Sequence, residues 1–175
     1  MKFTLSLLST IALASIPLAL ADEKKAEESP KPAVTDAGTD AKAPADTEKF
    51  DVEVVISGND QMQFDKKAFT VTAGEKVKLT FKNIGNLPKV AMGHNLVILN
   101  KGANKVEFAT AAIPAGPTSE YIPAAKKKEI LANTKLLGPK ESDSIIFTAP
   151  EPGKYDYLCT FPGHFALMNG AMTVK

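Results

Sequence analysis

Residues 159–168 read Cys-Thr-Phe-Pro-Gly-His-Phe-Ala-Leu-Met and lie between the last two segments with strand-like patterning, residues 154–159 and 170–174. This loop offers a thiolate, an imidazole and a thioether in the spacing C-x4-H-x3-M. Pro162 and Gly163 favour turns, so they would shape the chain between the thiolate and the imidazole. Thiolate and thioether ligands suit Cu(I), and imidazole also binds copper. The loop therefore indicates a copper site.

The rest of the ligand set has to come from outside this loop. The chain has two histidines and one cysteine. Taken singly, these residues and Met168 have ordinary explanations, such as an inert buried thiol or a methionine that fills a core. Taken together they match blue-copper sites, which combine two imidazoles and a thiolate with a weak axial thioether. We expect His94, Cys159, His164 and Met168 to bind one type 1 copper.

Short strand-like segments separated by turn residues cover most of residues 51–175. Val77-Lys78-Leu79-Thr80-Phe81, for example, alternates apolar and polar side chains. The predicted strands are residues 51–57, 63–64 with 68–72, 76–82, 95–100, 143–148, 154–159 and 170–174. Seven or eight such strands predict an all-β fold, a Greek-key two-sheet sandwich.

Residues 102–134 depart from this pattern. Residues 104–112 favour a short helix, and Pro114, Pro117 and Pro123 interrupt the chain beyond it. We expect a short helical insertion around residues 103–125 that packs on the outside of the sandwich.

The first 21 residues have the pattern of an export signal, with Lys2, an apolar stretch and Ala19-Leu20-Ala21 as a cleavage site. We expect cleavage before Asp22, and a retained membrane anchor is the alternative. Residues 22–48 are mostly Ala, Lys, Glu, Asp, Pro and Thr, and they carry too little apolar surface to offset the entropy of ordering. They predict a flexible tether, and residues 49–175 predict a single domain.

Composition restricts the chemistry further. The chain is 44% hydrophobic and 23% charged, with a net charge of +1, and we expect no nucleic-acid partner. One cysteine excludes an intrachain disulfide. In an oxidising compartment a lone thiol is buried, pairs with another chain or binds metal, and composition alone leaves these open.

Several motifs in a fixed order resemble the azurins, which are bacterial members of the cupredoxin family. The resemblance covers residues 51–175, essentially the whole predicted domain. Its motifs are the loop 159–168, Gly58-Asn59-Asp60-Gln61-Met62-Gln63-Phe64, Gly85-Asn86-Leu87-Pro88-Lys89, Met92-Gly93-His94-Asn95 and Thr134-Lys135-Leu136.

The resemblance implies a role for each ligand. His94 and His164 would bind copper through ring nitrogens and Cys159 through sulfur, all three as equatorial ligands. Met168 would be a long axial contact, with the carbonyl of Gly93 a second, weaker one opposite it. It also implies that the Asn95 side chain ties the two ligand-bearing segments together and that the Phe161 amide donates to the cysteine sulfur, contacts that orient ligands and tune the potential.

The resemblance also implies the function: a soluble periplasmic electron carrier, a monomer and not an enzyme. Its partners would be redox proteins such as c-type cytochromes or periplasmic reductases. Electrons would pass through His164 at the centre of an apolar patch formed by Met62, Leu87, Met92, Phe161, Pro162, Gly163 and Leu167.

The ligand count also bears on functions other than electron transfer. Copper storage or delivery is the chief alternative, although such proteins often carry extra Met and His clusters that this sequence lacks. An enzyme of the multicopper oxidase or nitrite reductase type needs several more histidines than two. Zinc also accepts Cys and His, but an axial thioether is a poor reason to expect zinc.

The sequence departs from the azurin pattern at a few positions. The family disulfide would join Val52 to Gly74 or Glu75, so the fold must be stabilised in another way or be less stable without metal. Asn83 stands where the family often has a non-ligand histidine, which implies little histidine-linked change in potential between pH 5 and 8. Leu96 stands where the family has a buried tryptophan.

Overall fold

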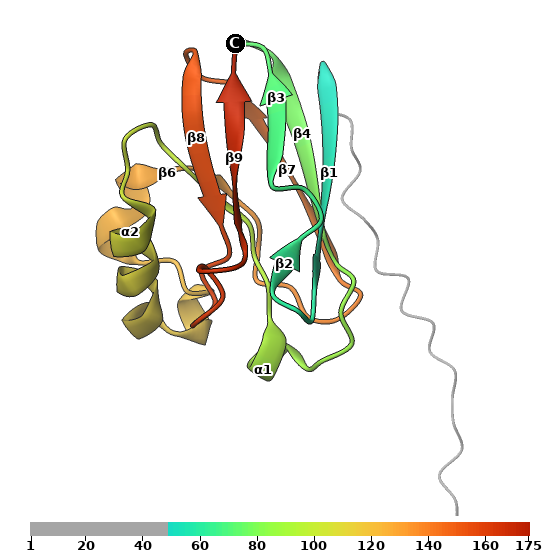
Figure 1. Ribbon diagram of the computed structural model, residues 1–175, viewed down its shortest axis with the longest axis vertical. Coiled ribbons are helices and arrows are strands. Elements are labelled where there is room, and N and C mark those ends of the chain that lie inside the picture. Colours follow the sequence, from blue (N-terminus) through green and yellow to red (C-terminus); the bar gives the residue numbers. More distant parts are fainter. Residues whose placement is uncertain (1–48) are drawn as a thin grey trace, which may run out of the picture. The chain divides into compact units, whose positions relative to one another are not determined.

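The structure is a computed structural model, and it describes residues 49–175. The predicted signal peptide (residues 1–21) and tether (residues 22–48) lie outside the described residues. Within the described part, nine strands form two sheets that face each other (Figure 1). In that same part, no helix is long and apolar enough to cross a membrane.

Both sheets contain parallel as well as antiparallel strand pairs. One sheet has the order β2-β1-β4-β7 and the other has the order β3-β9-β8-β5-β6, with β1 parallel to β4 and β3 parallel to β9. The strands are β1 Val52–Asn59, β2 Gln63–Phe64, β3 Ala68–Val71, β4 Lys76–Asn83, β5 Val97–Leu99, β6 Ile130–Asn133, β7 Ser142–Thr148, β8 Gly153–Leu158 and β9 Asn169–Val174. The predicted all-β sandwich is confirmed.

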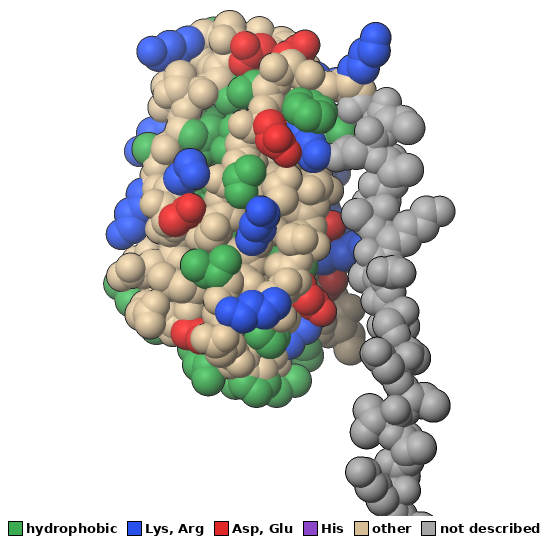
Figure 2. Space-filling model, turned by 90° about the vertical axis from the view of Figure 1, so that its right-hand side faces the viewer, with side chains coloured by type: hydrophobic (Ala, Val, Ile, Leu, Met, Phe, Trp, Pro, Cys, Tyr) green, Lys and Arg blue, Asp and Glu red, His purple; other side chains and the backbone are tan. Residues whose placement is uncertain are grey.

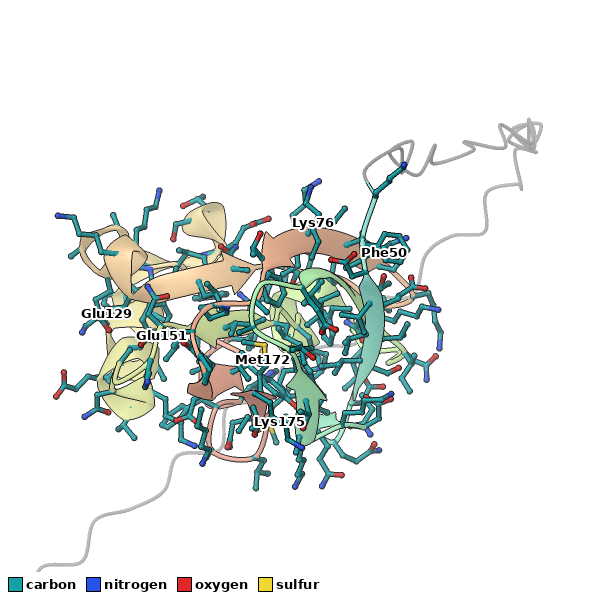
Figure 3. The ribbon with its side chains drawn as sticks, turned by 90° about the horizontal axis from the view of Figure 1, so that it is seen from above. Phe50, Lys76, Glu129, Glu151, Met172 and Lys175 are labelled. Atoms are coloured by element: carbon teal, nitrogen blue, oxygen red, sulfur yellow. The ribbon has the colours of Figure 1, made fainter. Side chains whose placement is uncertain are left out.

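The core between the sheets follows from strand alternation. In β4, Val77, Leu79 and Phe81 are fully buried, while the residues between them are half-buried, as expected for side chains that point alternately to the two faces. Met172 in β9 is also fully buried, and Figure 3 places it between the sheets. Tyr157 in β8 lies in the same core, and its hydroxyl donates to the backbone oxygen of Lys66 at 2.6 Å.

The helical insertion covers the outer face of the second sheet. It consists of α2 (Lys105–Ala112) and three 3-10 turns, η1 (Ile113–Ala115), η2 (Pro117–Ser119) and η3 (Ala124–Glu129). Phe108 and Ile122 pack against Val97, Leu99 and Leu158 in a second, smaller cluster. Because the sandwich covers one face of β5 and the insertion the other, all three β5 residues are buried.

Three details differ from the sequence prediction. The insertion extends to Glu129 and is followed by β6. This strand was not predicted because Ile130–Asn133 is short and its residues do not alternate between apolar and polar. The strand expected at residues 95–100 is restricted to Val97–Leu99, since Asn95 and Leu96 belong to the ligand-bearing segment that precedes it.

The ends of the strands fix where the site lies. In the pairing of β1 with β4, Val52 lies opposite Val77 at one end of the first sheet and Gly58 lies opposite Asn83 at the other. The strand from Val52 to Gly58 is about 20 Å long. The Gly58 end carries α1 (Lys89–Met92) and the loop that follows β8. The carboxyl end of the chain, at Lys175, lies at the opposite end (Figure 1).

A polar clamp joins two strand starts at the end of the sandwich away from the ligands. The Asp51 amide donates to the Lys76 carbonyl, and the Asp51 carboxylate accepts from the Lys76 amide, both at 2.8 Å. The amide of Gly74 donates to the carbonyl of Ala149 at 2.9 Å. Hydrogen bonds therefore join the start of β1 to the start of β4 where no disulfide can form.

Candidate metal centre

The four side chains predicted to bind metal come from two segments that meet at one end of the sandwich. Cys159 directly follows β8, His164 and Met168 lie in the loop between β8 and β9, and His94 lies between α1 and β5. His94, Cys159 and Met168 are fully buried and His164 is 3% exposed. The fold thus brings together all four residues.

The loop after Cys159 is held by its own backbone. His164 N donates to Phe161 O at 3.0 Å across Pro162-Gly163, and Gly163 has φ = 82°. This is the pattern of a type II turn, which favours proline and then glycine at its centre. Further along, Met168 N donates to His164 O at 2.8 Å and Cys159 N to Met168 O at 3.0 Å. These bonds set Cys159, His164 and Met168 in one compact loop.

His94 is positioned by a strand-like bridge to another segment. Its amide donates to the Leu137 carbonyl at 3.0 Å, and the Leu137 amide donates back at 2.7 Å. Gly93 is packed tightly here, since a Cβ at this position would lie 2.7 Å from the Lys89 carbonyl oxygen. The Asn83 side chain also donates to the Leu137 carbonyl, at 3.2 Å. Asn83 therefore has a structural role beside the segment that carries His94.

Three ligand atoms converge on one point. Nδ1 of His94 and Nδ1 of His164 are 3.2 Å apart, and Cys159 Sγ lies 3.9 Å from the first and 3.7 Å from the second. With bonds of about 2.0 Å to nitrogen and about 2.3 Å to sulfur, a metal in the plane of three such atoms requires separations of roughly 3.5 and roughly 3.7 Å. The side chains therefore fit a metal ion with little movement, and two imidazoles with a thiolate suit copper.

The electrostatics of the site favour uncharged imidazoles. Burial and then the neighbouring His94 lower the pKa of His164 to about 4. Burial also lowers the pKa of His94, and the backbone of Asn59 and the Asp60 carboxylate oppose this shift. Nε2 of His94 is buried, and no group within residues 49–175 lies in hydrogen-bond geometry to it. Both rings can therefore offer a lone pair at Nδ1 near neutral pH.

The thiol of Cys159 stays protonated near neutral pH unless a metal cation takes the place of its proton. Burial raises the pKa of Cys159 to about 12, while hydrogen bonds from the backbone of Asn95 and of Phe161 act in the opposite direction. This is in line with the predicted contact between the Phe161 amide and the sulfur, which stays a prediction. Since a metal replaces the thiol proton, metal binding would be coupled to proton release.

Asn95 joins the two ligand-bearing segments, as predicted. Its Oδ1 accepts from the Thr160 amide at 2.8 Å, and its Nδ2 donates to the Thr160 hydroxyl at 2.7 Å. A third bond, which the sequence did not indicate, runs from Nδ2 to the carbonyl of Glu120 at 3.0 Å. The helical insertion is therefore tied to the site through Asn95.

A stack of rings forms a second link to the insertion. Tyr121 packs edge-on against Phe161 with 5.2 Å between ring centroids, and Phe161 lies 4.6 Å from the His164 ring. Glu120 and Tyr121 could not be predicted from the sequence. The first acts through its backbone carbonyl and the second through a ring contact made only in the folded chain, and neither leaves a signal in residue spacing.

A family model described as copper binding proteins of the plastocyanin/azurin family matches residues 50–175. The chain belongs to this family. Membership makes it a blue copper protein that transfers electrons, with one copper as its cofactor. Proteins of the azurin type are electron carriers that pass electrons to partner proteins.

Individual azurins and related structures agree with this assignment. Azurin-2 of Alcaligenes xylosoxydans xylosoxydans is 38% identical over 124 residues, which are 69% of this chain and 95% of that protein. Azurin of Bordetella pertussis is 42% identical over 123 residues, 68% of this chain and 81% of that protein. Auracyanin A, a "blue" copper protein from the green thermophilic photosynthetic bacterium Chloroflexus aurantiacus, superposes with a TM-score of 0.64 at 36% identity, covering 70% of this chain and 98% of that chain.

The azurin-like domain presents apolar side chains at its copper end. Leu87 is 44% exposed and Leu167 is 53% exposed, and Val90 in α1, which was not predicted, is 90% exposed. Figure 2 shows hydrophobic side chains gathered at the lower end of the molecule, where Figure 1 places α1. Phe161 is only 9% exposed, so it supports the patch from below instead of forming its surface.

Proposed function

We propose that this domain is a periplasmic electron carrier in which His94, Cys159, His164 and Met168 hold one type 1 copper. The carbonyl of Gly93 would add a weak further contact. The observation that carries this proposal is the convergence of two Nδ1 atoms and one Sγ atom within 4.8 Å, on side chains that are buried.

The surrounding residues account for fast electron exchange. When bound, copper supplies a one-electron couple between Cu(I) and Cu(II). The bridge from His94 to Leu137 and the bonds from Asn95 to Thr160 hold the ligands from outside the site. Side chains fixed in this way move little when the charge of the site changes, and their burial excludes water. With four ligands committed, no open position remains for a substrate.

The ligand assignment is tested by adding Cu(II) to the apoprotein and recording visible and electron paramagnetic resonance spectra. We expect an intense blue absorption and a narrow copper hyperfine splitting, both arising from the thiolate of Cys159. Cys159→Ser should abolish both, whereas Met168→Leu should keep the colour and shift the reduction potential. A colourless product from the unaltered chain would overturn the assignment.

Copper delivery, the alternative from the sequence, predicts ligands that exchange metal readily. The three equatorial candidates are at most 3% exposed, which favours retention. We therefore expect loss of Cu(I) to a chelator such as bathocuproine disulfonate to be far slower than oxidation of the same protein by ferricyanide. Comparable rates would favour delivery.

The location and partners rest on the sequence. The export pattern of residues 1–21 supports a periplasmic location. The proposed organisation is a signal peptide (residues 1–21), a tether (residues 22–48) and a domain that begins at residue 49. We expect the mature protein in the osmotic-shock fraction, with Asp22 at its N-terminus and the mass of a monomer. Its partners would be c-type cytochromes or periplasmic reductases, and reduction by a cytochrome c in stopped-flow mixing tests this class.

A further inference from the structure

Gly58 lies where the first sheet meets the proposed axial ligand. It is buried near the end of β1, and an added Cβ would lie 2.5 Å from Met168 Cε and 2.9 Å from Phe81 Cζ. A Cβ does not approach other heavy atoms this closely in real proteins. The terminal methyl of Met168 therefore occupies the space that a side chain at residue 58 would take.

The backbone does not require glycine here. Gly58 is not among the described residues with positive φ, so its conformation is open to any residue. Glycine inside a strand costs stability, because it loses more conformational freedom on folding than other residues and offers no side chain to pack. The close approach of Met168 is thus the physical reason for glycine at this position.

The two groups that enclose the Met168 methyl, the Gly58 backbone and the Phe81 ring, are both held in place. The backbone of Gly58 pairs with Phe64 on one side and Asn83 on the other, and its carbonyl accepts from the Ile84 amide at 2.9 Å. Phe81 is fully buried and packs edge-on against Phe64, with 5.7 Å between ring centroids. The methyl group is therefore held between a fixed strand and a fixed ring.

The other end of the Met168 side chain is also fixed. The Met168 amide donates to the His164 carbonyl at 2.8 Å, and its carbonyl accepts from the Cys159 amide at 3.0 Å. Since the backbone and the terminal methyl are both held, the sulfur between them has little freedom along its approach to the other ligands.

We infer that Gly58 is a positioning residue that sets the place of the axial thioether by leaving room for its methyl group. This inference rests on the proposed function, in which Met168 is the axial ligand. A side chain at residue 58 would displace the methyl and move the sulfur away from its present position. The three heavy atoms nearest to such a Cβ belong to Met168 and Phe81, so the equatorial ligands should keep their arrangement.

The test is Gly58→Ala in the copper-loaded protein, measured by reduction potential and electron paramagnetic resonance. We expect a shift of the potential in the same direction as that of Met168→Ala, with a changed hyperfine splitting and a retained blue absorption. In the Met168→Ala background, where no methyl remains to be displaced, Gly58→Ala should leave the potential within measurement error. Ser57→Ala, on the other face of the same strand, is the matched control and should shift nothing.

The outcomes distinguish the role of Met168 as axial ligand from the role of Gly58 in placing it. If Met168→Ala itself leaves potential and spectrum unchanged, the axial assignment in the proposed function is wrong. If Met168→Ala shifts the potential and Gly58→Ala does not, or shifts it equally in both backgrounds, the role of Gly58 is wrong. Should Gly58→Ala be too unstable to load with copper, Gly58→Ala/Met168→Ala removes the closer collision, at 2.5 Å from Met168 Cε, although the 2.9 Å contact with Phe81 Cζ remains. The double variant should therefore be more stable than Gly58→Ala, and no gain in stability would overturn the inference.

Discussion

Glu120 and Tyr121 both have φ = 56°, although neither is glycine. The left-handed region costs a residue with a side chain about 1 kcal/mol or more, and such residues gather at functional sites. Here the two residues form the contact between the insertion and the ligand loop, through the Glu120 carbonyl on Asn95 and the Tyr121 ring on Phe161. The strained backbone therefore lies directly behind the site.

Glu120→Gly should stabilise the apoprotein by about 1 kcal/mol, because glycine adopts positive φ without steric cost. Asn95 bonds to the backbone of residue 120, so the spectrum of the copper protein should not change. Urea unfolding of the apoprotein measures the first effect, and Glu120→Ala, which keeps the strain, is the control. A loss of stability in Glu120→Gly would show that the strain at residue 120 is smaller than the backbone entropy that glycine adds to the unfolded chain.

The imidazoles predict how the apoprotein responds to acid. His164 has its pKa lowered to about 4 in the folded chain, against about 6.5 when unfolded. Between these values the unfolded chain binds the proton and the folded chain does not, so stability falls as pH decreases through this window. We expect a loss on the order of a few kcal/mol between pH 7 and pH 4 in urea titrations of the apoprotein.

The copper-loaded protein is the contrasting case. The chain has two histidines, and both would be committed to the metal, while Asn83 takes the place of a further one. Its reduction potential should therefore stay constant between pH 5 and 8 in voltammetry. A marked step in that range would point to loss of a ligand imidazole.

At the scale of elements, the clamp between Asp51 and Lys76 joins two strands by hydrogen bonds alone. It joins two strand starts in the folded state, but it does not restrict the unfolded chain as a covalent bond would. Two hydrogen bonds at an exposed strand end contribute about 0.5–1.5 kcal/mol each. The element is therefore held less firmly than by a bridge.

Asp51→Ala should lower the free energy of unfolding by about 1 kcal/mol, since the Lys76 amide loses its carboxylate acceptor. Asp51→Asn keeps an acceptor oxygen and should lose less. Urea unfolding of both apoproteins measures the difference, and the copper spectrum should be unchanged in both because the clamp lies at the far end of β1. Equal losses in the two variants would assign the effect to charge and not to the hydrogen bond.

The elements that could be predicted from the sequence are those with a local signal. Alternation located β1, β4, β7 and β8, and the ligand loop was found because Cys159, His164 and Met168 are close in sequence. His94 followed from the small number of histidines. β6 could not be predicted, since Ile130–Asn133 becomes a strand only by pairing with β5. Contacts such as Gly58 with Met168 join residues far apart and leave no pattern.

At the scale of the whole molecule, we expect redox partners to bind at the end where the apolar side chains of Leu87, Val90 and Leu167 are exposed. Small, weakly charged contact areas suit short-lived redox encounters. Leu167→Glu should slow electron self-exchange tenfold or more, because each encounter would bring two buried charges together. Val106→Glu in α2 is the matched control, as Val106 is 52% exposed and Leu167 is 53% exposed. Nuclear magnetic resonance line broadening in mixtures of both oxidation states measures the rates, and equal slowing in both variants would place the encounter elsewhere.

The carboxyl end of the chain lies at the end of the sandwich away from the ligands. The Lys175 carbonyl accepts from the Ala73 amide at 2.9 Å, beside the strand starts and about 20 Å of strand from Gly58. If the Lys175 side chain is linked covalently to an electrode, the end of the sandwich that carries the ligands should point away from the electrode and stay open to dissolved partners. A film of alkanethiol would instead adsorb the molecule by its apolar end. The same protein would then give two different voltammetric responses, set by which end is attached.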